Sequence, residues 1–246
     1  MFYRQKRRSL GPVIFQMMVG GFSQRRATLC LQINRKTLVR KFVAMGALAQ
    51  HLLHNTNIRM EPVKVMEFDD LETFVHTKCK PLSVTLAVES GTRRILGFRV
   101  ADMPAKGKLA AVALKKYGPR RDERPETRDE LFGELSALLA EKPTIKSDQN
   151  PHYRAYVAYH FPDCEHLTYK GRRGCVVGQG ELKRGGFDPL FSLNHTCAML
   201  RANINRLVRR TWCTTKRKDR LSLHIALYAL YHNLYLLGKA RSHAPT

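Results

Sequence analysis

Carboxylates in two separate parts of this 246-residue chain are the residues best suited to chemistry. Glu67, Asp69, Asp70 and Glu72 lie in one alternating segment, and Asp148 ends another, 79 residues after Asp69. Two carboxylates that converge repel each other unless a divalent cation lies between them. Such a pair is the minimal requirement for a two-metal phosphoryl-transfer site.

The hydrophobic pattern predicts the elements that would position these carboxylates. Alternating or apolar segments favour strands over residues 63–74, 82–88, 95–100, 143–148 and 164–169, with a hairpin turn at 90–92. Helices are predicted over 105–117, 127–141 (capped by Thr127 with Glu130), 152–161, 189–211 and 219–237. The order predicts an α/β fold with a five-stranded mixed sheet, in which the first and fourth strands are neighbours and carry Asp69 and Asp148 to one edge.

Strand alternation separates the other acids by face. Asp70 points away from Asp69, so we expect Asp70 on a solvated face and not in a metal site. Glu67 shares the face of Asp69 and could support it.

Residues 1–60 carry 11 basic residues and no acidic one. A short apolar helix over 12–20, a helix over 24–31 capped by Ser23, a turn at 32–34 and a basic helix over 35–53 fit a helix-turn-helix. We therefore predict a small all-α DNA-binding domain over residues 1–58 and a catalytic domain over 59–246. An ordinary helical hairpin with a solvated basic face is the alternative. The residues expected to face the DNA are Arg35, Lys36, Arg40 and Lys41.

Composition limits the partners and the compartment. The net charge of +23 implies a polyanion, with nucleic acid ahead of an anionic membrane, and the 43% hydrophobic fraction is enough for a folded core. No apolar run approaches the length of a membrane span, and no signal peptide is predicted. The six cysteines form no C-x-x-C pair, which argues against a zinc ribbon or a secreted disulfide framework and favours the cytoplasm.

Four segments together resemble bacterial insertion-sequence transposases of the DDE class, which have an RNase H-like (ribonuclease H) fold. They are EFDDLETFVHTK (67–78), TRRILGF (92–98), SDQNPHYRAYVAYHFPDCEH (147–166) and LRANINRLVRRTWCTTK (200–216), and the likeness extends from about Glu61 to Asn233. The resemblance implies Mg²⁺ or Mn²⁺ held by Asp69 and Asp148. The usual third acid is replaced by Asn194, with Glu181 and Asp188 as alternative ligands.

The resemblance also implies the function. A transposase would bind the terminal inverted repeats of its element and catalyse strand cleavage and transfer, as a dimer or larger assembly on double-stranded transposon ends and target DNA. It would be cytoplasmic and bacterial, associated with the nucleoid when bound to DNA. A catalytically inactive, transposase-derived DNA-binding protein is the alternative, and an RNase H-type nuclease is a third hypothesis. The basic residues expected beside the site are Arg201, Arg206, Arg209 and Arg210.

Overall fold

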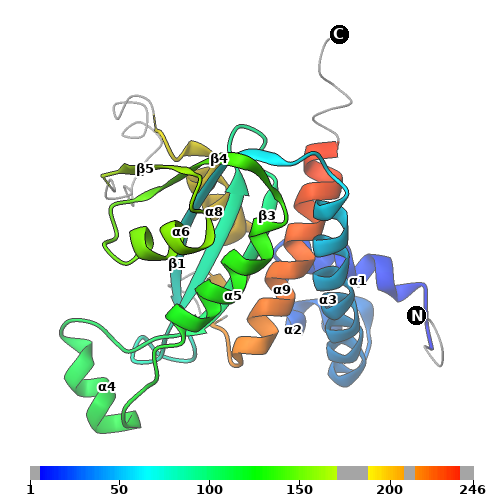
Figure 1. Cartoon of the computed structure of the whole chain (residues 1–246). Coiled ribbons are helices and arrows are strands. Elements are labelled where there is room, and N and C mark those ends of the chain that lie inside the picture. The colour runs from blue at the N-terminus through cyan, green and yellow to red at the C-terminus, as the bar shows by residue number, and fades with distance from the viewer. Residues whose placement is uncertain (1–5, 171–187, 208–213, 239–246) are drawn as a thin grey trace.

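A computed structural model describes residues 6–170, 188–207 and 214–238. The described chain is an α/β fold built on an open, five-stranded mixed sheet in the order β3-β2-β1-β4-β5 (Figure 1). The strands are β1 (Val63–Phe74), β2 (Pro81–Glu89), β3 (Ile95–Asp102), β4 (Leu139–Asp148) and β5 (Glu165–Tyr169). The pairs β1–β2 and β2–β3 are antiparallel, whereas β1–β4 and β4–β5 are parallel. The predicted α/β class and mixed sheet are confirmed, with β1 beside β4.

Helices cover both faces of the sheet. Their bounds are α1 (Leu10–Val19), α2 (Gln24–Leu31), α3 (Arg35–Ile58), α4 (Leu109–Tyr117), α5 (Arg124–Ser136), α6 (Tyr153–His160), α8 (Phe191–Asn203) and α9 (Lys218–Tyr231), followed by a π-helical turn (His232–Leu236). Met66 and Phe68 of β1 pack with α5 and α6 in one core cluster. Leu71 of β1 belongs to a second cluster with α1, α3, α8 and α9. Alternation along β1 therefore places successive side chains in different cores.

Several element boundaries differ from the sequence prediction for local reasons. Ser23 caps α2 as expected, since its hydroxyl accepts from the Arg26 N–H at 3.2 Å. Helix α5 begins at Arg124, with Pro125 in its first turn, so Thr127 is inside the helix and does not cap it. The Thr127 hydroxyl instead donates to the Glu123 carbonyl at 2.9 Å. Helix α8 ends at Asn203, before a short 3₁₀ turn over Asn205–Leu207.

The N-terminal helices share a hydrophobic core with the C-terminal helix. Ile14 of α1, Phe42 of α3 and Ile225 of α9 are fully buried in one cluster, and Figure 1 shows α3 and α9 side by side. His224 of α9 lies 2.8 Å from the Met18 carbonyl of α1 through Nε2. Described residues of the first 58 positions therefore share one core cluster with α8 and α9.

Gly46 of α3 lies where this helix approaches α9 closely, and Gly133 of α5 provides a matched control. A Cβ at Gly46 would lie 2.7 Å from Leu223 Cβ, whereas a Cβ at Gly133 of α5 would meet no atom within 4 Å. Both positions are helical, so alanine improves intrinsic helix propensity equally. We expect Gly46→Ala to lower the free energy of unfolding by about 1–3 kcal/mol and Gly133→Ala to raise it by about 0.5–1 kcal/mol. Urea denaturation measures both, and a gain in both variants would contradict the close approach.

Candidate active site

The parallel pairing of β1 with β4 aligns the two predicted aspartates. Val65 pairs with Thr144 and Glu67 with Lys146. Asp69 on β1 and Asp148 at the end of β4 each follow this last pair by two residues. The negative charge of Asp148 is one of the causes that raise the pKa of Asp69. The two carboxylates therefore lie close enough to repel each other.

Asp69 occupies an environment that disfavours its charged form. Its pKa is raised to about 6, first because the side chain is largely buried and second because Asp148 is near. Two donors oppose this shift: the Asp70 N–H at 2.7 Å and the Tyr153 hydroxyl at 3.0 Å, both bonded to Asp69 Oδ1. The second oxygen, Oδ2, has no hydrogen-bond partner in the described part of the chain.

Asp148 has a similar arrangement. Its Oδ1 accepts the Asn150 N–H at 2.9 Å in a turn after β4. Each aspartate thus has one oxygen held by a donor, while the other stays available to a ligand. These are hard oxygen donors of the kind that Mg²⁺ and Mn²⁺ take. Within the described ranges, no three His, Cys, Asp or Glu side chains form a group that could hold a metal, so a cation would need further oxygen ligands from an amide, water or substrate.

The predicted third ligand lies on helix α8. Asn194 is exposed in the first turn of α8, and its side-chain amide donates to Asp188 Oδ2 at 2.9 Å. No described hydrogen bond joins Asn194 or Asp188 to Asp69 or Asp148. One turn further along α8, the buried thiol of Cys197 has a pKa raised to about 12, first by burial, and both Arg201 and Asp69 influence it. Helix α8 therefore passes Asp69. Glu181 lies outside the described residues.

Glu67 anchors helix α8 to the sheet. Its side chain is 2% exposed, and its carboxylate accepts the Ser90 hydroxyl at 2.6 Å and the Leu193 N–H at 2.9 Å. Leu193 is in the first turn of α8, where a negative charge satisfies an unpaired N–H and favours the helix dipole. Glu67 therefore supports the site by holding α8 beside β1.

Asp70 is not on a solvated face, so that prediction is wrong. Its carboxylate accepts the Thr85 hydroxyl at 2.6 Å and pairs with Arg128 at 2.8 Å, and the Arg128 side chain is 4% exposed. The alternate face of β1 is covered by α5, which supplies Arg128. Both carboxylate oxygens of Asp70 are bonded to these partners, which agrees with the prediction that Asp70 is not a metal ligand.

Arg128 and Tyr153 are residues that the sequence analysis missed. The Arg128 guanidinium lies 4.9 Å from the Tyr153 ring centre and 5.1 Å from that of Tyr156. Arg128 thereby holds the ring whose hydroxyl reaches Asp69. Tyr153 follows Asp148 by only five residues, and this spacing could have indicated that it lies near the aspartates. Nothing in the sequence indicated that Arg128 lies there.

The predicted DNA-binding residues divide by exposure. Arg35, Lys36 and Arg40 of α3 and Arg201 of α8 are exposed. Lys41 is not: it is only 8% exposed, because it is three residues after Leu38 on the face that packs into the core. The predicted outward orientation of Lys41 is therefore wrong. The Arg206 guanidinium packs over Phe42, 5.8 Å from its ring centre. Arg209 and Arg210 lie outside the described residues.

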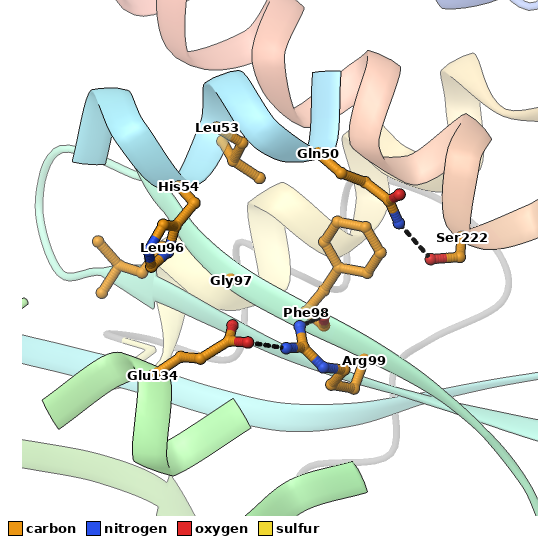
Figure 2. A pocket seen from close by; sticks show the side chains of 9 residues that line it. All are labelled: Gln50, Leu53, His54, Leu96, Gly97, Phe98, Arg99, Glu134 and Ser222. Atoms are coloured by element: carbon orange, nitrogen blue, oxygen red, sulfur yellow. Dashed lines mark hydrogen bonds and ion pairs between the residues drawn. The ribbon is translucent and has the colours of Figure 1, made fainter. Parts of the chain in front are cut away.

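A hollow of about 310 Å³ lies elsewhere, between α3, β3, α5 and α9 (Figure 2). Gln50 and Ser222 hydrogen bond across it at 3.0 Å, and Arg99 pairs with Glu134. Neither aspartate lines it. The candidate site at Asp69 and Asp148 is therefore separate from this hollow.

No protein-family model matches the sequence, and no curated protein matches it.

Removing the charge of Asp148 should stabilise the protein at neutral pH. Because the pKa of Asp69 is about 6 and its usual value is 3.8, the folded state binds this proton more tightly than the unfolded state. The free energy of unfolding therefore decreases as pH rises from 4 to 6. Above pH 6 the folded protein bears the full cost of ionising Asp69. We expect Asp148→Asn to raise the free energy of unfolding by about 1 kcal/mol at pH 8 and to change it little at pH 4. Denaturant titrations at both pH values measure this, and an equal effect at both would contradict the repulsion.

The two tyrosines that contact Arg128 provide a matched pair of variants. Both variants keep the aromatic ring beside Arg128. Tyr153→Phe removes the hydroxyl that donates to Asp69, whereas Tyr156→Phe removes a hydroxyl that does not contact Asp69. We expect Tyr153→Phe to lose about 1–2 kcal/mol of unfolding free energy at pH 7, since the hydrogen bond has a charged acceptor. Tyr156→Phe should change it by less than about 0.5 kcal/mol. Equal losses would mean that the hydrogen bond from Tyr153 to Asp69 makes no specific contribution to stability.

Proposed function

We propose that this chain is a DNA transposase of the DDE class, with an RNase H-like catalytic part that carries out metal-dependent strand cleavage and strand transfer. The observation that carries the proposal is the convergence of Asp69 and Asp148 on neighbouring parallel strands. Their negative charges repel each other, and a bound cation would neutralise this repulsion. The five-stranded mixed sheet with helices on both faces is compatible with the RNase H-like fold.

The donor set fits Mg²⁺ or Mn²⁺. Asp69 and Asp148 each present a carboxylate oxygen that the described hydrogen bonds leave available, and the amide oxygen of Asn194 is a neutral third candidate one turn from Cys197 on α8. When bound, the metal ions would polarise the scissile phosphate and stabilise the attacking and leaving oxygens of an in-line displacement. The neutral amide leaves the site with less negative charge than three carboxylates, so the metal should be held more weakly.

The chain's own residues would position these groups. Tyr153 and the Asp70 N–H both donate to one oxygen of Asp69, and the described hydrogen bonds leave the other oxygen available to a ligand. Glu67 holds α8 and therefore Asn194 and Arg201 near the site. A water first, and then the freed 3′-hydroxyl, would attack phosphorus without a covalent protein intermediate.

Residues 1–58 supply the proposed end recognition. The segment α1–α3 has the element order of a helix-turn-helix, with Asn34 capping α3 through its side chain at 2.8 Å from the Lys36 N–H. Arg35, Lys36 and Arg40, exposed in its first turns, would contact the inverted repeats. Two ends must be held together, so we propose a dimer or larger assembly on DNA, in a bacterial cytoplasm. No helix in the described ranges is long and apolar enough to cross a membrane.

Removal of either aspartate tests the proposal. Asp69→Ala and Asp148→Ala should retain binding of duplexes that carry the element ends and lose cleavage by at least about 100-fold, because the metal loses a charged ligand. Asp163→Ala, at an exposed aspartate in the turn before β5, serves as the control for the loss of a carboxylate away from the site. Gel assays of cleavage with Mg²⁺ and Mn²⁺ measure the outcome, and cleavage that persists in either alanine variant would refute the site.

A catalytically inactive, transposase-derived DNA-binding protein is the second candidate. The observation that favours it is Asn194, an uncharged residue whose amide is bonded to Asp188. Binding of end-containing duplexes without any metal-dependent nicking, even with Asn194→Glu, would support this candidate over the first.

A further inference from the structure

Three segments that are distant in the sequence bring lysines to one end of the sheet. They are the hairpin between β1 and β2, the region of helix α4, and the segment just before α9. We call this group the lysine lobe. Its members are Lys78, Lys80, Lys106, Lys108, Lys115, Lys116 and Lys216.

Direct contacts hold α4 against the hairpin. Lys80 Nζ lies 4.1 Å from the centre of the Tyr117 ring, at the end of α4. Before the helix, Lys106 pairs with Glu72 of β1 at 2.6 Å. Both ends of the α4 region are therefore attached to the end of β1, while the helix itself projects from the body of the molecule (Figure 1).

The segment before α9 joins the same end. Thr215 forms a β-bridge with Val75, directly after β1. Lys216 Nζ lies 3.4 Å from His76 Nδ1 in the hairpin. This contact adds a further cation to the lobe from the C-terminal part of the chain.

The lobe carries positive charge that its surroundings do not neutralise. Residues 103–119 contain four lysines and no acidic residue. Lys78, Lys108, Lys115 and Lys116 are exposed, and none of them has an ion-pair partner among the described residues. The nearest acids at the base of α4 are already paired. They are Asp102, with Arg120 and Lys218, and Glu123, with Lys218.

The lobe lies at the edge of the sheet where the candidate site opens. Strands β1 and β4 are parallel, so the end of β1 and the end of β4 at Asp148 point the same way. Asp69 is five residues before the end of β1 at Phe74, which corresponds to roughly 16 Å at 3.3 Å per residue. A duplex rises about 3.4 Å per base pair, so the span from Asp69 to the end of β1, where the hairpin of the lobe begins, matches about five base pairs.

We propose that the lysine lobe binds the phosphates of duplex DNA about five or more base pairs from the reacting phosphate. The proposal rests on the proposed function for the position of that phosphate, and on the lobe's own charge for the choice of partner. Exposed lysines such as Lys108, Lys115 and Lys116, which have no ion-pair partner among the described residues, suit a phosphate backbone, because they contact it without reading sequence. The lobe therefore adds a contact region separate from the basic helix α3 and from Arg201 on α8.

The test compares two double variants that remove the same charge from different ends of the sheet. Lys115→Ala/Lys116→Ala changes the lobe, and Lys64→Ala/Lys142→Ala removes two exposed lysines from the first halves of β1 and β4. Binding of a labelled random-sequence duplex to the full chain is measured between about 50 and 200 mM salt. We expect the slope of log K against log salt to fall by about two in the lobe variant and to stay unchanged in the control.

The outcomes separate this proposal from the proposed function. Equal slopes in both variants and the wild-type protein, or equal losses in both variants, would overturn the lobe and leave the transposase proposal standing. A loss confined to the lobe variant, with no metal-dependent cleavage by the wild-type protein, would keep the lobe and reject the transposase. A third variant, Val112→Ser/Leu114→Ser, alters exposed apolar residues of α4. If the salt slope is unchanged in the lobe variant and this third variant loses self-association, the lobe is a surface for protein contacts and the proposal is overturned.

Discussion

The arrangement of the site depends on one unfavourable interaction, the repulsion between Asp69 and Asp148. Parallel pairing of β1 with β4 brings the carboxylates near each other, and partial burial of Asp69 weakens the solvation that would screen their charges. A folded protein tolerates such a pair only when neighbouring elements hold it. The surrounding elements therefore hold the two carboxylates in place against their mutual repulsion.

Those supports come from both faces of the sheet. On one face, Arg128 pairs with Asp70 and holds the ring of Tyr153, so that a hydroxyl reaches Asp69. On the other face, Glu67 fastens the first turn of α8 to β1. The alternation of β1 explains why one strand can serve both networks, because adjacent residues point to opposite layers.

The sequence predicted the part of this arrangement that follows from pattern. Strand alternation and the order of elements were sufficient for the mixed sheet and for the proximity of Asp69 and Asp148. Contacts between distant elements could not be predicted, because they depend on side-chain packing. The burial of Lys41 follows from which face of α3 meets α9, and the ion pair of Asp70 follows from the position of Arg128 on α5. The ion pair of Asp70 has no signal at the level of local spacing, whereas the spacing of Lys41 from Leu38 becomes informative only once the buried face of α3 is known.

The charge distribution of the chain has a different meaning once the core is known. The cationic N-terminal and C-terminal parts are packed together through α3 and α9, so they do not act as independent tails. DNA bound to them under the proposed function would bring phosphates toward two carboxylates that already repel each other. The added negative charge raises the cost of ionising Asp69, and a divalent cation offsets it. DNA and metal should therefore strengthen each other's binding, since each reduces the electrostatic cost that opposes the other.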